Sequence, residues 1–272
     1  MIRRAAVLLA LFVGSLTSSV LAADWESTLS AVSPGTFQPP RPVHTKYRFG
    51  WNGFMAGTLD LRLARTAVDR FQVDATAHTI GLARTLWKFD ANHISIADTA
   101  TLHPVEVRQT ETTRKKKTIT NLHFDTRGVT SRRAEIPSKS EGPKLRRFDF
   151  PNLFDLQSAL LYIRSQPLTE GSVQRIVVYP ADSAYLATIT VLSRARLTTA
   201  VGAFNAIKVD LQLNKIGKNR ALEPHRKFRR ATGWLSDDAD RLVLKLEAQL
   251  FVGTVSAELQ SFEFENAGPR AN

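Results

Sequence analysis

The sequence predicts an all-β protein, mainly antiparallel, in which a strongly curved sheet or incomplete β-barrel holds one buried helix near residues 152–165. Three observations predict this class. Apolar and polar residues alternate along most of the chain, turn-forming residues separate the alternating segments, and one segment has helical spacing instead. Alternation places one face of each strand in a core and the other in water, as antiparallel sheets allow.

The first residues have the order of a secretory signal peptide. Arg3 and Arg4 precede an apolar run, and small residues follow as far as Ala22 and Ala23. The apolar run is shorter than the roughly 20 residues that a transmembrane helix needs, and no comparable run recurs. We expect residues 1–22 to be a cleaved signal peptide, and the mature chain to lie in the periplasm without a transmembrane segment. An uncleaved N-terminal anchor is the alternative.

The rest of the chain is expected to form one domain. Residues 23–42 contain four prolines and predict an extended leader, residues 43–265 a single β-rich domain, and residues 266–272 a disordered tail. Cysteine is absent. Disulfides, thiolate metal sites, cysteine nucleophiles and a lipoprotein anchor are therefore excluded, and a hydrophobic core must hold the fold.

The predicted strands follow one another from residue 43 onward. Their alternating apolar residues are, in chain order, Leu59/Leu61/Leu63, Phe71/Val73/Ala75/Ala77, Val105/Val107, Leu122/Phe124, Ile176/Val178, Ile189/Val191, Val209/Leu211/Leu213, Leu242/Leu244/Leu246, Val255/Ala257/Leu259 and Phe262/Phe264. Residues 134–148 are polar and basic with two prolines, so we expect a long loop there.

One segment interrupts the alternation. Leu153, Leu156, Leu160 and Ile163 recur at intervals of three and four, which predicts a helix that is buried against the sheet or fills its open end. Charged residues on such a helix are costly to bury. We therefore expect Asp155 and Arg164 to have a structural role, holding the helix to the sheet. A second, short helix is considered over residues 81–87.

The segment from Tyr47 to Gly57 combines aromatic residues with glycines. Tyr47, Phe49 and Trp51 share one face of a strand, and Gly53 and Gly57 bracket a turn. Such a ladder either fills a core or lines an apolar cavity. The residues that we consider as cavity lining are Tyr47, Phe49, Trp51, Trp87, Tyr162 and Trp234.

The chain is strongly basic, with a formal net charge of +12. An exported protein meets anionic lipids and polymers rather than nucleic acid, so no nucleic-acid partner is expected. The clustered cations are either solvated turns or a surface that steers anionic head groups. The candidates for that surface are Arg114, Lys115, Lys116, Lys117, Arg146 and Arg147. The first four are expected at a hairpin tip.

The sequence shows no motif for catalysis or metal binding. The six histidines are scattered without zinc-site spacing, and no Gly-x-Ser-x-Gly elbow occurs. We predict no metal, no cofactor and no catalytic residue. Asp238, which follows Ser236 closely, is expected to cap a turn between two strands.

Several short motifs together resemble the domain of unknown function 3108 family of exported bacterial envelope proteins. They are Tyr47, Trp51, Gly53, Ala56 and Gly57; Asp98 and Leu102-x-Pro104; Asp155-x-x-Ser158-Ala159-Leu160-x-Tyr162-x-Arg164; Pro167-Leu168-x-x-Gly171; Thr198 with Gly202-x-Phe204; and Trp234-x-Ser236-x-Asp238 with Gly253. The resemblance implies a β-rich fold loosely similar to the half-barrels of periplasmic lipoprotein carriers, and it implies no activity.

The function we expect is non-catalytic binding of an apolar or amphipathic envelope ligand, a lipid or acyl chain, in the concavity of the sheet. Two alternatives stay open. One is a protein–protein interaction or envelope assembly factor with an envelope protein as partner. The other is a hydrolase acting on an envelope polymer, which requires a cleft that the sequence does not reveal.

Overall fold

The computed structural model of the chain describes residues 25–138, 142–225, 228–250 and 253–265. The expected signal peptide and the expected tail after residue 265 lie outside this part. In the described part the sheet is nearly all antiparallel, as predicted, and no helix is long and apolar enough to cross a membrane.

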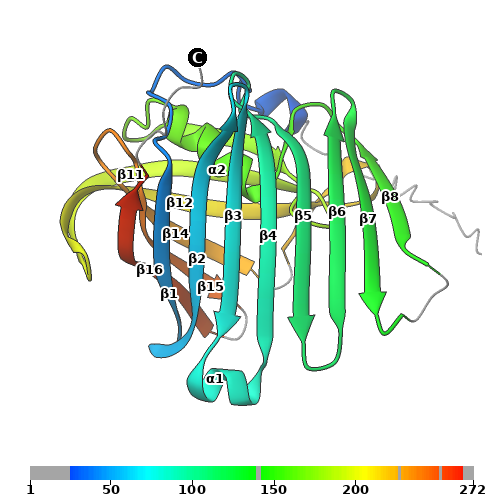
Figure 1. Cartoon of the computed structure of the whole chain (residues 1–272). Coiled ribbons are helices and arrows are strands. Elements are labelled where there is room, and N and C mark those ends of the chain that lie inside the picture. Colours follow the sequence, from blue (N-terminus) through cyan, green and yellow to red (C-terminus); the bar gives the residue numbers. More distant parts are fainter. Residues whose placement is uncertain (1–24, 139–141, 226–227, 251–252, 266–272) are drawn as a thin grey trace, which may run out of the picture.

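The N-terminal half of the sheet is a meander in which each strand pairs with the next (Figure 1). Its strands are β1 (Val43–Trp51), β2 (Phe54–Ala67), β3 (Arg70–Thr79), β4 (Phe89–Asp98), β5 (Pro104–Thr113), β6 (Lys117–Asp125), β7 (Gly128–Ile136) and β8 (Lys144–Asp149). The short helix α1 (Gly81–Leu86) connects β3 to β4. It confirms the helix considered over residues 81–87.

The C-terminal half contains the main helix and the remaining strands. They are β9 (Leu153–Phe154), α2 (Leu156–Ser165), β10 (Val173–Val178), β11 (Tyr185–Thr199), β12 (Gly202–Ile216), β13 (Leu222–Pro224), β14 (Phe228–Ser236), β15 (Val243–Leu250) and β16 (Gly253–Phe264). A 3-10 turn, η2 (Lys218–Arg220), precedes β13, which pairs with β12.

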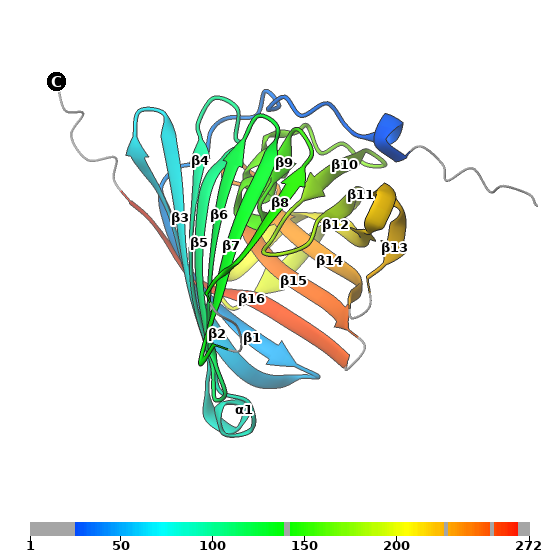
Figure 2. The same cartoon turned by 90° about the vertical axis from the view of Figure 1, so that its right-hand side faces the viewer.

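The two halves are one continuous sheet because its first and last strands pair. In the register of β1 with β16, Val43 lies opposite Phe264. The sheet then runs from β8 at one edge, through β1 and β16, to β9 at the other edge. It curls so that the two halves face each other (Figure 2). In the part of the chain that the structure describes, the edges β8 and β9 do not pair, so the structure confirms the predicted incomplete barrel rather than a closed one.

The inner faces of the two halves pack directly against each other. Val107 and Leu122 of the N-terminal half share a fully buried cluster with Leu186 of the C-terminal half. Helix α2 fills the space beside this cluster, where Tyr162 is fully buried with its ring centroid 5.0 Å from that of Phe154. The predicted buried helix is therefore confirmed, and the concave side is occupied by the protein's own side chains at this end.

Buried polar contacts fix α2 between the halves. The Asp155 side chain accepts a hydrogen bond from Ser158 N at 2.6 Å, and the Ser158 hydroxyl accepts one from Asp155 N at 3.0 Å. The other Asp155 oxygen accepts from the Ser95 hydroxyl on β4. At the opposite helix end, Arg164 Nη2 donates to Asp240 O at 2.5 Å. Burial lowers the Arg164 pKa to about 10.

The leader packs along the domain. It contains the 3-10 turn η1 (Trp25–Thr28), whose Trp25 ring stacks on Phe150 at 5.8 Å between centroids. Further on, the Tyr162 hydroxyl donates to Ala31 O at 2.6 Å, and Gly35 N donates to Ser165 Oγ at 2.9 Å. The segment therefore covers one side of α2. The boundaries drawn at residues 23–42 and 43–265 remain predictions.

Two local expectations were wrong. Residues 134–148 are not one long loop, because β7 continues to Ile136 and β8 begins at Lys144. Gly57 lies within β2 rather than in the turn, and a Cβ there would come within 2.5 Å of His78 O on β3. Gly53 does occupy the β1–β2 turn, with φ of +84°. Such a backbone favours glycine.

Candidate functional site

Directly opposed residues of an antiparallel sheet lie on the same face, so the strand registers define a row across the inner face of the N-terminal half. In this row Leu61 on β2 lies opposite Ala75, Ala75 opposite His93, and His93 opposite Gln109. It continues through Thr120 and Arg133 to Lys144 on β8. The inner face therefore changes from apolar on β2 and β3 to basic on β7 and β8. We call this sequence of seven residues the amphipathic row.

Additional apolar residues lie next to the apolar part of that row. Leu59, Ala77 and Ala91 oppose one another on β2, β3 and β4, and Glu111 follows them on β5. Leu59, Leu61, Ala75 and Ala77 are only partly buried, unlike the fully enclosed core clusters. Apolar side chains thus continue from the core toward the end of the sheet away from α2.

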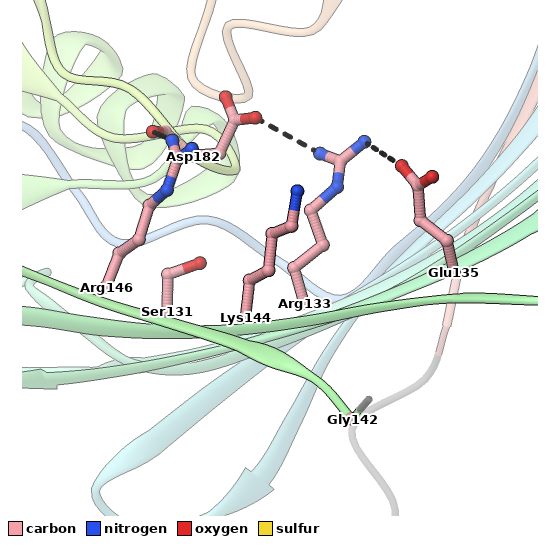
Figure 3. A pocket seen from close by; sticks show the side chains of 7 residues that line it. All are labelled: Ser131, Arg133, Glu135, Gly142, Lys144, Arg146 and Asp182. Carbon is pink, nitrogen blue, oxygen red and sulfur yellow. Dashed lines mark hydrogen bonds and ion pairs between the residues drawn. The ribbon is translucent and has the colours of Figure 1, made fainter. Parts of the chain in front are cut away.

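The basic end of the row forms a pocket of about 240 Å³ (Figure 3). Its lining residues are Ser131, Arg133 and Glu135 of β7, Gly142 of the β7–β8 connection, Lys144 and Arg146 of β8, and Asp182 of the β10–β11 connection. Pockets that enclose a drug-sized ligand span roughly 300–1,000 Å³. This pocket is therefore of a size for a small charged group rather than for a whole lipid.

The two arginines of the pocket contact Asp182 from the other half of the sheet. Arg133 Nη1 lies 3.4 Å from Asp182 Oδ2, and Arg133 Nη2 lies 3.7 Å from Glu135 Oε1. Arg146 Nη1 donates to the backbone oxygen of Asp182 at 3.2 Å, which leaves its charge unneutralised. In Figure 3 the Lys144 amine points toward the same space as Arg133.

The charge of the pocket is positive. Among the residues that the structure describes, no carboxylate lies within 4.0 Å of the Lys144 amine or the Arg146 guanidinium. Three cations thus face two carboxylates, and one of these, Glu135, also pairs with Lys116 at 2.8 Å. That hydrogen bond holds the Glu135 pKa below its ordinary value.

A histidine lies further along the row. His93 Nε2 is 3.5 Å from Glu111 Oε1, an ion pair when the imidazole is protonated. This contact with His93 lowers the Glu111 pKa, against the effect of burial. Beside it the Gln109 amide donates to Pro180 O at 2.7 Å. The Gln109 hydrogen bond connects the two halves of the sheet. The described residues contain no group of three ligands that could hold a metal ion.

The six aromatic residues considered as cavity lining do not meet in one cavity. Tyr47 and Tyr162 are buried in separate core clusters, and Phe49 is partly buried on β1. Trp51 and Trp87 are exposed at the end of the sheet away from α2. The Trp234 ring lies between two lysine amines, with Lys208 Nζ at 5.6 Å and Lys245 Nζ at 5.4 Å.

The six basic candidates divide into three groups. Arg114, Lys115 and Lys116 form the β5–β6 turn, and Lys117 begins β6, which confirms the expected hairpin tip. Arg146 lines the pocket. Arg147 points to the other face of β8, where it pairs with Asp125 at 2.7 Å and with Asp149 at 2.7 Å.

Asp238 lies in the connection between β14 and β15. Its Oδ1 accepts hydrogen bonds from the Ser236 hydroxyl at 2.7 Å, from Asp240 N at 2.9 Å and from Arg241 N at 3.0 Å. This geometry is that of a turn capped by a side chain.

Sequence reasoning did not identify Arg133, Asp182 or His93 as site residues. A signal for two of the strands was available. In Ser131-x-Arg133-x-Glu135 and Lys144-x-Arg146-x-Phe148, the alternate positions share a face of each strand. The meeting of these strands with Asp182 depends on the curl of the sheet, which alternation does not specify.

The fold and this pocket define an open, β-barrel-like protein with a charged site on its concave face. The chain belongs to the family described as protein of unknown function (DUF3108), whose model matches residues 46–260. No curated protein matches the chain.

Five solved chains match this one, among them the following two. The first is a β-barrel-like protein of the domain of unknown function DUF1849 from Brucella abortus. The two are 7% identical with a TM-score of 0.60, over 84% of this chain and 100% of that one. The second has a YmcC-like fold and comes from Bacteroides fragilis, with 10% identity and a TM-score of 0.31 over 85% of this chain and 99% of that one. At these identities the first likeness concerns the fold alone.

Proposed function

We propose that the protein binds an anionic amphiphile of the cell envelope without catalysis, holding the head group in the pocket of Arg133, Lys144 and Arg146. The observation that carries this proposal is the amphipathic row, which leads from those cations to Leu61 along one face. From β7 to β2 there are five strand spacings, or about 24 Å at about 4.8 Å each. A lipid acyl chain is of comparable length.

Three features support an amphiphile rather than a wholly apolar ligand. The packed core leaves the α2 end of the concavity filled. The pocket itself is positively charged and small. The partly buried apolar residues, Leu59, Leu61 and Ala75 among them, lie on the same face as the pocket, at the β2–β3 end of the row. The signal-peptide pattern of the first residues, with Arg3 and Arg4, supports a place in the periplasm, where such lipids are encountered.

Binding of short-chain lipids tests the head-group pocket. Dihexanoyl phosphatidylglycerol, below its micellar concentration, is expected to bind the wild-type protein more tightly than dihexanoyl phosphatidylcholine does in isothermal titration calorimetry. A charged hydrogen bond contributes about 1.5–3 kcal/mol, so Lys144→Ala and Arg146→Ala are each expected to weaken binding by about 10- to 100-fold.

Arg147→Ala is the matched control, because Arg147 is adjacent to Arg146 but lies on the other face of β8. Its affinity should equal that of the wild type. Equal affinities for all three variants and the wild type would exclude the pocket as the binding site of the head group. The dioctanoyl lipid should bind more tightly than the dihexanoyl one, since each buried methylene contributes about 0.8 kcal/mol. Affinity that is independent of chain length would exclude the apolar part of the row as the binding site of the acyl chain.

A further inference from the structure

Large apolar side chains gather at one end of the N-terminal half-sheet. Because the meander is antiparallel, the β1–β2 turn, α1 and the β5–β6 turn all lie at this end (Figure 1). The exposed apolar side chains there are Trp51, Phe54 and Met55 of the β1–β2 hairpin, and Leu82, Leu86 and Trp87 of α1 and its C-terminal end, with exposed fractions between 45% and 79%. Exposed apolar patches of this kind commonly mark a binding surface.

The backbone that presents these side chains is held in place. Leu82 and Leu86 are four residues apart and therefore lie on one face of α1. Ile80 N donates to Ala56 O at 3.0 Å, which ties the start of α1 to β2. The Thr79 hydroxyl donates to Trp87 O at 3.0 Å, and the ring of Trp87 stacks on Phe89 at 5.2 Å.

Basic residues lie directly beside the apolar ones. The Arg114 guanidinium on the β5–β6 turn donates to Thr85 O in α1, so the turn and the helix are in contact. Lys116 pairs with Glu135. In the described part of the chain no ion pair involves Lys115 or Lys117, and both are exposed. We call these nine residues the rim: Trp51, Phe54, Met55, Leu82, Leu86, Trp87, Arg114, Lys115 and Lys117.

We infer that the rim docks the protein onto the surface of a bilayer that contains anionic phospholipid. Aromatic and aliphatic side chains partition into the interfacial region of a bilayer, and nearby lysines and arginines are attracted to anionic head groups. An apolar patch alone would suit a protein partner equally well. The unpaired lysines beside it favour the anionic bilayer, because they give the charge complementarity that this surface offers.

The pocket lies near the same end of the half-sheet as the rim. Gly142, in the β7–β8 connection at the same end of the half-sheet, lines the pocket described above. Docking through the rim would bring the open end of the concave face toward the lipid. The rim does not depend on the proposed function, since binding to vesicles requires neither Lys144 nor Arg146.

Co-sedimentation with vesicles tests the rim. The exported protein should bind vesicles of phosphatidylglycerol and phosphatidylethanolamine, and should not bind phosphatidylcholine vesicles. Each basic residue near an anionic surface contributes roughly a fewfold to tenfold in binding. Lys115→Glu/Lys117→Glu is therefore expected to lower the partition coefficient at least about tenfold. Leu82→Ser/Leu86→Ser should lower it similarly. Brominated lipid should quench the tryptophan fluorescence of the wild type, but much less that of Trp51→Phe/Trp87→Phe, which lacks both rim tryptophans.

Matched controls lie at the opposite end of the same strands. Val68 in the β2–β3 turn and Arg127 in the β6–β7 turn are both exposed, so Val68→Ser and Arg127→Glu should bind vesicles as the wild type does. All variants change exposed residues, and thermal unfolding checks that each is folded. Absence of vesicle binding, equal binding by rim and control variants, or rim-dependent binding to an envelope protein but not to vesicles would each overturn the inference.

Discussion

Tyr47 links strands that are distant in the chain. Its hydroxyl donates to Val243 O at 3.0 Å, from β1 to β15, and burial raises its pKa to about 12. In the unfolded chain a tyrosine titrates near pH 10. The folded state therefore holds the proton more tightly than the unfolded state, and its contribution to stability is complete below about pH 10 and is lost as pH rises through about 12.

Tyr47→Phe tests this residue. At pH 8 the variant should be about 1 kcal/mol less stable than the wild type, because it lacks the hydrogen bond to Val243. Between pH 8 and pH 11 the wild type should lose about 1.4 kcal/mol more stability than the variant. At pH 11 the unfolded tyrosine is about one unit above its pKa and ionised, while the folded one is still protonated, and one unit corresponds to about that free energy. Urea unfolding at the two values measures both quantities. Parallel losses in the two proteins would show that Tyr47 does not titrate differently on unfolding.

Helix α2 contacts both halves of the sheet. Its N-terminal cap, Asp155, also binds Ser95 of β4, and its far end contacts the β14–β15 connection through Arg164. Leu161 packs in the same cluster as Leu244, and Ile163 in the same cluster as Ile207. The helix therefore contacts strands of both halves.

Asp155→Ala should destabilise the protein by about 2–4 kcal/mol. A lost N-cap accounts for about 1 kcal/mol, and the buried Ser95 hydroxyl left without its acceptor for about 1–3 kcal/mol. Leu156→Ala, at the first position of the same helix and 52% exposed, is the control and should change stability little. Chemical denaturation of both variants measures the difference. Equal small losses would mean that the cap is not a major source of stability.

Elements with an apolar face were predictable and β8 was not. The strands around Leu122 and Val209 alternate because one face packs in a core. In β8 the inward positions are Lys144, Arg146 and Phe148, and the outward Arg147 is ion-paired, so no apolar period marks the strand. The basic residues that line the pocket are therefore also the reason why β8 could not be predicted from alternation.

The aromatic residues of β1 show what alternation cannot predict. Tyr47 is buried, Phe49 partly buried and Trp51 exposed, because β1 runs out of the packed region toward the rim. The register of β1 with β2 also shifts between Phe49 and Gly50. Alternation gives the face of a residue, but not how far along that face the core extends.

At the scale of the whole molecule, the site exists only because the sheet curls. Asp182 belongs to the C-terminal half, while Arg133 and Lys144 belong to the N-terminal half, and the contact between them crosses the concave side. The sequence predicted the curved sheet and its helix, and the similarity to the Brucella abortus protein is likewise one of fold. Which cations meet is set by strand register and curvature together, and these are properties of the assembled sheet.

The most direct measurement is native mass spectrometry of the exported protein purified from its own envelope, with the released lipids then extracted and identified. The proposed function predicts about one anionic, acyl-bearing molecule per chain, retained by the wild type and by Arg147→Ala but lost from Lys144→Ala and Arg146→Ala. A ligand-free mass for the wild type, or a lipid retained equally by all four proteins, would contradict it.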